Sequence, residues 1–161
     1  MKRRTFVPQD AAQLDWISDL SGQSLSAAQT LQWLNLWADA GWLRRLDAAL
    51  ASQLLRLDGQ ASPALLVAAA LLAQMEGRGH TCLPLPVLLR APVEWLGWPA
   101  QAVQGEQGLH ALWQHMPGTL DGWHQVLCSP VLRHADQPDA GQPLVLGGTA
   151  QAPLLYLRRY A

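Results

Sequence analysis

The amino-acid sequence predicts a mainly α-helical protein: a compact bundle of about six helices followed by a small C-terminal β-hairpin. Apolar residues recur at helical spacing between capping residues along most of the chain. Residues 64–73 are apolar on every side, as in a buried central helix. Two short apolar runs, 144–146 and 154–157, are typical of paired strands. We therefore expect a helical domain over residues 1–135 and a hairpin over residues 136–161.

Capping residues and glycine stops mark the first two predicted helices. Asp10 caps the first helix, and Ser21-Gly22 ends it. Its apolar face consists of three side chains at helical spacing: Leu14, Ile17 and Leu20. Ser24 or Ser26 caps the second helix, which ends at Gly41.

The third predicted helix, residues 42–57, has the clearest helical pattern. Five leucines share one of its faces: Leu43, Leu46, Leu50, Leu54 and Leu57. The charged residues lie off that face: Arg44, Arg45, Asp47 and Arg56. This arrangement predicts an amphipathic helix with the leucines on its apolar side.

The fourth predicted helix is the central one. Ser62 caps it, Pro63 occupies its first position, and two glycines, Gly77 and Gly79, end it. Residues 80–86 follow as an extended edge segment or loop, because the two prolines there cannot donate to a strand ladder.

Shorter elements fill the rest of the helical region. We expect short helices over residues 86–89 and 92–97, and a loop over residues 99–108. Another helix starts near Leu109 and stops at Pro117, and Thr119 caps the last one. Gly147-Gly148 belongs to the hairpin connection and lacks the spacing of a phosphate-binding loop.

The charge balance excludes several functions. The 161 residues are 50% hydrophobic and 14% charged, against about 25% charged in an average soluble domain. A net charge of −1 argues against a domain that binds nucleic acid mainly by neutralising phosphates. Lys2 is the only lysine, so the folded part offers no Walker lysine or Schiff-base lysine.

The low charge does not indicate a membrane protein. The longest apolar run, residues 64–73, is about half of what a membrane-spanning helix needs. A basic start resembles a signal peptide, but polar residues from Pro8 to Gln13 stand where its apolar region should be. We expect a cytoplasmic protein with two free thiols, Cys82 and Cys128.

The candidates for catalysis or metal binding are weak. His124 and Cys128 are four residues apart and can share a helix face, but no third ligand follows at structural-zinc spacing. His80 and Cys82 lie two apart, with no residue to orient a catalytic base. We therefore expect no catalytic, cofactor-binding or metal-binding residues in this chain.

Tryptophan is the unusual feature of the composition, with eight residues. Tryptophans serve either a large core or a protein interface, where they are enriched at hot spots. We expect part of a partner interface among five of them: Trp33, Trp37, Trp42, Trp95 and Trp98.

Three stretches together resemble one known family: residues 65–85, residues 143–146 and residues 155–160. Two strings within them are the specific part. The first string comprises Gly79, His80, Cys82, Leu83, Pro84 and Leu85, and the second comprises Leu155, Tyr156, Leu157, Arg158 and Tyr160. In this order and separation they resemble the N-terminal region of the alpha subunit (RecD) of exodeoxyribonuclease V, the RecBCD complex. The resemblance extends from about Trp37 to the C-terminus.

The resemblance implies a role in DNA double-strand-break repair and recombination. Full-length members are ATP-dependent 5′-to-3′ DNA helicases whose motor domains follow the second string, so ATP and Mg²⁺ are expected only there. This chain would then be a non-catalytic docking domain. It would bind the gamma subunit (RecC) and, through it, the beta subunit (RecB), while the whole complex handles DNA.

Two alternatives remain open at this stage. The chain could be a self-contained helical adaptor that forms a homodimer through Trp33 and Trp37. It could also be a small hydrolase or metal enzyme that uses its histidines. The exposure of the tryptophans and the surroundings of His124 and Cys128 discriminate among these hypotheses.

Overall fold

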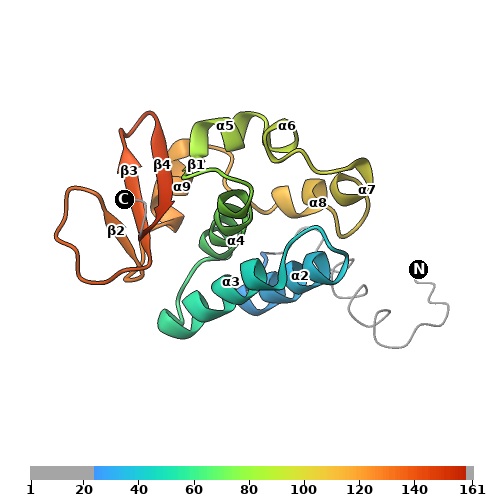
Figure 1. The fold of residues 1–161 in the computed structure, drawn as a ribbon, viewed down its shortest axis with the longest axis horizontal. Coiled ribbons are helices and arrows are strands. Elements are labelled where there is room, and N and C mark those ends of the chain that lie inside the picture. Colours follow the sequence, from blue (N-terminus) through green and yellow to red (C-terminus); the bar gives the residue numbers. More distant parts are fainter. Residues whose placement is uncertain (1–23, 159–161) are drawn as a thin grey trace.

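A computed structural model describes residues 24–158 of the chain. Helices surround one central helix, and a small sheet covers one end of the molecule (Figure 1). The helix predicted after Asp10 lies outside the described residues, as do Trp16 and Tyr160.

Helices α2 (Ala27–Asp39) and α3 (Arg45–Leu57) form a helical hairpin. Ser26 caps α2 in a reciprocal arrangement: its Oγ accepts from Gln29 N at 3.1 Å, and its own N donates to Gln29 Oε1 at 3.0 Å. Gly41 reverses the chain with φ +86°. Helix α3 starts three residues later than the leucine pattern predicts, because Trp42 N and Leu43 N both donate to Trp37 O in the turn.

Helix α4 (Pro63–Gly77) lies at the centre of the molecule, as the sequence predicts (Figure 1). Ser62 Oγ accepts from Leu65 N at 3.1 Å and donates to Val126 O at 2.7 Å. Eleven of its fifteen residues are buried. It contacts α2, α3, α9 and two strands of the sheet, which is why it is apolar on every side.

Five short helices follow α4 in the chain: α5 (Leu85–Arg90), α6 (Pro92–Leu96), α7 (Ala100–Val103), α8 (Leu109–Trp113) and α9 (Leu120–Val126). The described residues therefore contain eight helices, where the sequence suggested about six for the whole chain. The expected loop over residues 99–108 is wrong in part, because α7 forms within it. Prolines such as Pro92 and Pro99 separate these helices, since the residue before a proline avoids helical geometry.

The predicted C-terminal hairpin is confirmed, and it belongs to a larger sheet. Strands β3 (Leu144–Gly148) and β4 (Pro153–Leu157) pair antiparallel, with Val145 opposite Tyr156. Strand β1 (Leu83–Pro84) adds antiparallel to β4, and β2 (Leu132–His134) adds parallel to β3. The order is β1-β4-β3-β2, so the hairpin lies between two further strands. Strand β1 lies at the sheet edge within residues 80–86, the segment predicted to be extended or a loop, whereas β2 falls in the region expected to be helical.

One apolar core joins the helices to the sheet. It includes Trp33, Trp37 and Trp123, all at most 1% exposed. Trp37 and Trp98 meet edge to face with ring centroids 4.9 Å apart. Among residues 24–158, no helix is long and apolar enough to cross a membrane.

Candidate protein-docking groove

Three of the five tryptophans expected at an interface are core residues. Trp33 and Trp37 are almost fully buried, and Trp98 is 8% exposed. Both helix α2 indoles donate to one carbonyl, Gln107 O, at 2.9 Å from Trp33 Nε1 and 2.6 Å from Trp37 Nε1. The three rings are buried in the domain's own core and their N–H groups are hydrogen-bonded. The prediction that they form part of a partner interface is therefore wrong. The hypothesis of a dimer through Trp33 and Trp37 loses its basis for the same reason.

The other two tryptophans are half-buried. The Trp42 carbonyl accepts a hydrogen bond from the Gln74 side chain, whose Oε1 in turn accepts from Trp98 Nε1 at 2.9 Å. The Trp95 ring packs against His80 with centroids 5.3 Å apart. These two remain partly accessible, but each is already engaged by a neighbour within the domain.

The histidine and cysteine candidates do not converge. His124 Nε2 lies 3.2 Å from Ala150 O, and Cys128 Sγ donates to the carbonyl of His124 at 3.5 Å. In the part of the chain that the structure describes, no three His, Cys, Asp or Glu side chains are grouped to hold a metal. Both cysteines are free, and burial raises the pKa of the Cys82 thiol.

The leucine stripe of α3 is only partly buried. Leu43 and Leu54 are in the core, but Leu46 is 67% exposed and Leu57 is 57% exposed. The helix instead buries Asp47, Ala48, Ala51 and Leu54. The small alanines let α3 lie close against α4, and this packing turns part of the stripe outward.

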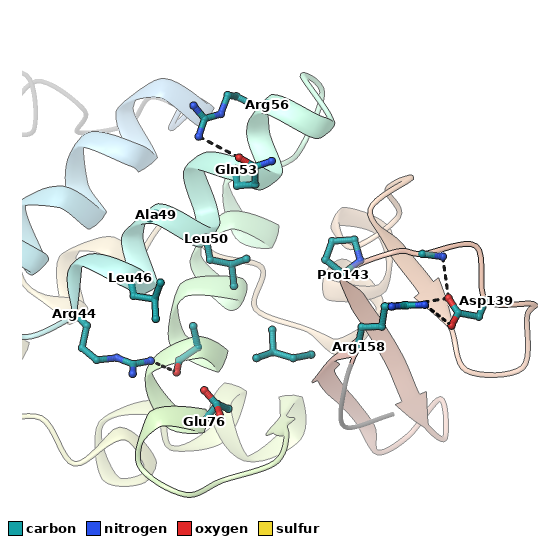
Figure 2. Close-up of a pocket in the computed structure, with 13 residues that line it drawn as sticks. Arg44, Leu46, Ala49, Leu50, Gln53, Arg56, Glu76, Asp139, Pro143 and Arg158 are labelled. Carbon is teal, nitrogen blue, oxygen red and sulfur yellow. Dashed lines mark hydrogen bonds and ion pairs between the residues drawn. The ribbon is translucent and has the colours of Figure 1, made fainter.

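A groove of about 810 Å³ lies between the outward face of α3 and the sheet. We call it the α3–β4 groove. Its α3 wall consists of Leu46, Ala49, Leu50, Gln53 and Arg56, and its sheet-side wall consists of Asp139, Gly141, Pro143, Leu157 and Arg158. Arg44, Ala73 and Glu76 complete the lining. Figure 2 shows Leu50 pointing from α3 toward the sheet, with Arg56 and Glu76 at opposite ends.

A buried carboxylate fixes one end of this groove. Asp47 is fully buried, and its oxygens accept from Arg44 N at 2.8 Å and Arg44 Nη2 at 2.7 Å. Arg44 Nη2 also donates to Ala73 O on α4 at 2.7 Å. The hydrogen bond to Asp47 raises the pKa of Arg44, so the guanidinium stays charged and ties the start of α3 to the end of α4.

A second ion pair holds the sheet side. Arg158 Nη2 lies 3.0 Å from Asp139 Oδ2, and Gly141 N donates to Asp139 Oδ1 at 2.8 Å. The Gly141 bond, followed by the Arg158 bond, lowers the pKa of Asp139. The two bonds attach the loop before β3 to the end of β4, which gives the groove a defined second wall.

The charge of Arg56 is not balanced in this way. Arg56 Nη2 donates to the neutral Gln53 Oε1 at 3.1 Å. Within residues 24–158, Arg56 forms no ion pair. The α3–β4 groove therefore combines an apolar wall with one available positive charge at its open end.

The two strings that carry the family resemblance meet in the sheet. Leu83 in the first string lies opposite Leu155 in the second, because β1 pairs with β4. Leu83, Leu85 and Leu155 are buried, and Gly79 needs its φ of +100° to end the α4 turn. These positions are mainly structural, except that Leu157 and Arg158 also line the groove.

A family model described as "RecBCD enzyme subunit RecD, N-terminal domain" matches residues 39–151. The chain belongs to this family. None of the curated proteins compared with the chain matches it. The RecD N-terminal domain match covers α3 through β3, and therefore the helix that carries the leucine stripe.

The α3–β4 groove is the feature that sequence reasoning missed in this RecD N-terminal domain. The leucine pattern identified an apolar face of α3, but it could not show that alanines on a neighbouring face would pack against α4. Two large apolar side chains are exposed among the described residues, Leu46 and Leu57, and both are on this helix. Leu46 lines the groove, and a large exposed apolar side chain in a groove is typical of an interaction surface.

Proposed function

We propose that this chain is a non-catalytic docking domain of a RecD-type alpha subunit, and that the α3–β4 groove receives the gamma subunit (RecC). Through RecC it would join the beta subunit (RecB) in a cytoplasmic complex that acts in double-strand-break repair and recombination. ATP and Mg²⁺ would be handled by motor domains of the alpha subunit, and DNA by the whole complex.

The exposure of Leu46 beside the groove carries this proposal. Leu46 is 67% exposed, and burying this side chain against a partner's apolar surface would be favourable because it removes apolar area from water. The groove is anchored at both sides by charge-assisted hydrogen bonds, Arg44 to Asp47 and Arg158 to Asp139. A preformed groove loses little conformational freedom on binding, which favours docking.

Binding of purified RecC to the chain, measured by calorimetry, tests the proposal. Leu46→Glu places a charge in the groove and should weaken binding at least about tenfold, because a charge buried in an apolar contact costs more than about 1.4 kcal/mol. Leu57→Glu is the matched control. It changes a leucine of similar exposure (57% against 67%) on the same helix that does not line the groove.

Both leucines are exposed, so neither substitution should unfold the domain. Equal affinities for Leu46→Glu and the unmodified chain would place the docking surface elsewhere. No association with RecC at all would refute the docking role itself. A self-associating chain, seen as a dimer by sedimentation, would instead support the adaptor alternative.

A further inference from the structure

The outward face of helix α3 has the residue spacing of a helix that packs along a second helix. Leu46, Leu50 and Gln53 follow one another at intervals of four and three residues, which places them in one row on the helix. All three line the α3–β4 groove. Alternating intervals of three and four are the spacing at which paired helices interlock their side chains. Leu57 continues the row but lies outside the groove, so the contact that we propose ends one turn before it.

The sheet-side wall favours a helix over an added strand. Strand β4 lies between β1 and β3, and its residues 154–155 are paired on both edges. Nearby backbone groups are also in use: Arg158 N donates to Pro143 O at 2.9 Å, and Gly141 N donates to Asp139. An added strand needs free N–H and C=O groups at an edge, whereas a helix satisfies its own backbone and needs only side-chain contacts. A helix is therefore the occupant that fits this wall.

The end of the groove near Arg56 presents only hydrogen-bond donors. Arg56 Nη2 donates to Gln53 Oε1 at 3.1 Å, which occupies the acceptor atom of the amide (Figure 2). The remaining guanidinium N–H groups and Gln53 Nε2 are donors. Within the part of the chain that the structure describes, neither side chain forms an ion pair. Several donors beside a positive charge form a binding site for a carboxylate.

The other arginines of the groove are already paired. Arg44 is bound to Asp47, with Nη2 2.7 Å from Oδ1, and Arg158 is bound to Asp139, with Nη2 3.0 Å from Oδ2. Of the three described arginines that line the groove, Arg56 alone has no acidic partner among residues 24–158. A carboxylate brought by a partner would therefore bind at the Arg56 end.

We propose that RecC inserts one amphipathic helix into the α3–β4 groove, where its apolar face covers Leu46 and Leu50 and one of its carboxylates binds Arg56 and Gln53. This inference rests on the proposed function, because it names the part of RecC that the groove receives. The apolar contacts remove Leu46 from water. The carboxylate fixes the position of the helix along the groove, as charged side chains beside a helix–helix contact do.

Photo-crosslinking of the 161-residue chain to purified RecC tests the helix. A short diazirine side chain stands at Leu46 in one variant and at Gln53 in another. These positions are seven residues apart on α3, which is about 10.5 Å. A partner helix covers this distance with about seven residues, and an extended strand covers it with about three. We expect the two variants to capture RecC residues about seven apart in one continuous segment.

Other crosslinking patterns would overturn the proposal. Captured residues about three apart would mean an extended segment, and captures in two separate segments would exclude a single helix. Photo-linked dimers of the chain would show that a second copy occupies the groove. The control position is Arg90, which is exposed at the end of α5 and does not line the groove. It should capture RecC at least about tenfold less than Leu46, because crosslinking requires contact, and equal capture would also contradict the proposal.

Substitution of Arg56 tests the carboxylate. Arg56→Glu should weaken RecC binding at least about tenfold in calorimetry, because it replaces an attraction by a repulsion inside the contact. Arg56→Lys keeps the charge but loses the paired N–H groups, and should weaken binding about two- to fivefold. Arg90→Glu is the control: it changes the net charge equally outside the groove and should alter binding less than about twofold. Equal losses for Arg56→Glu and Arg90→Glu would contradict a specific contact.

A reciprocal change in RecC tests the same contact from the other side. The aspartate or glutamate of RecC nearest the residue captured from Gln53 is replaced by arginine. This change alone should weaken binding to the unmodified chain, and it should restore binding to the Arg56→Glu variant to within about threefold of the original affinity. A loss of binding that is not restored in the double variant would overturn the carboxylate contact.

The same experiments separate this inference from the docking function. If RecC does not bind the chain, the docking function fails and this inference fails with it. If Leu46→Glu weakens RecC binding but the captured residues lack helical spacing, the groove remains the docking surface and only the helix is refuted. If RecC binds and neither groove position captures it, docking lies elsewhere on the chain and this inference is overturned.

Discussion

Helices α3 and α4 are neighbours in sequence and in space, yet they use their apolar residues in opposite ways. Helix α4 buries eleven of its fifteen residues. Helix α3 has five leucines in its pattern and buries only Leu43, just before its start, and Leu54 completely. Helix α4 is apolar on every side, whereas α3 is amphipathic, but the leucine stripe of α3 does not show by itself that part of it stays exposed.

The difference lies in what surrounds each helix. Helix α4 contacts helices on several sides and the sheet at its end. Helix α3 packs on α2 and α4, and its third side faces the α3–β4 groove. An apolar stripe therefore predicts that one face of a helix packs against another surface. Whether that surface belongs to the same domain or to a partner depends on the neighbouring elements.

Truncation of one leucine on each helix should give the largest contrast. Leu66→Ala on α4 should lower the free energy of unfolding by about 2–5 kcal/mol, because it leaves a cavity at a fully buried position. Leu46→Ala on α3 should change it by less than about 0.5 kcal/mol. Urea unfolding of both variants measures the difference, and equal losses would show that the α3 face is covered in the free chain.

The buried carboxylate of α3 should give the next largest effect. Asp47→Ala should cost about 2–3 kcal/mol, since it removes the hydrogen bonds to Arg44 N and the guanidinium that hold α3 on α4. Asp39→Ala is the control, because Asp39 and Arg45 form a solvent-exposed ion pair. This substitution should lower the free energy of unfolding by less than about 1 kcal/mol. Similar unfolding midpoints for the two variants would argue against a structural role for Asp47.

The two cysteines give a second comparison between a partly buried and an exposed position. Burial raises the pKa of Cys82 and limits access to it, whereas Cys128 is exposed. Iodoacetamide at pH 7.5 should therefore modify Cys128 roughly tenfold faster than Cys82. Peptide mass spectrometry after timed quenching measures both rates, and faster modification of Cys82 would contradict the packing of β1 on the core.

The smallest effect concerns the sheet-side wall of the groove. Asp139 has a lowered pKa, so its contribution to stability is present above its ordinary value of 3.8 and is lost as the pH falls through the folded-state pKa. Asp139→Asn should lower the unfolding midpoint slightly at pH 7 and not at all in strong acid. Asp136→Asn in the same loop is the control, and a difference that persists in acid would rule out the ionised carboxylate as its source.

Local sequence rules predicted the helices well. Ser26, Ser62 and Thr119 cap α2, α4 and α9 as expected, and their side chains accept the expected backbone N–H groups. The β3–β4 hairpin was predicted, and residues 80–86 were predicted as an extended edge segment or loop, which agrees with β1 at the sheet edge. Strand β2 and the pairing of β1 with β4 were missed, because such short strands depend on distant segments and show no local period.

The candidate site was predicted less well, for two physical reasons. Tryptophan is suited to both cores and interfaces, and a hydrogen bond to one carbonyl, Gln107 O, was enough to satisfy Trp33 and Trp37 in the core. The leucine stripe of α3 competed with a neighbouring face that carries Ala48 and Ala51, and this face is buried together with Leu54 of the stripe. The alanine face packs against α4 because small side chains let two helices approach closely. Counting apolar residues along the sequence does not reveal this preference.

Hydrogen exchange of the chain, with and without RecC, tests the central claim most directly. The claim is that the open face of α3 is a docking surface of this RecD N-terminal domain. We predict that RecC slows exchange in peptides covering residues 45–57 and 139–158, which form the two walls of the α3–β4 groove. Protection confined to other segments, such as the short helices α5 to α8, would contradict it.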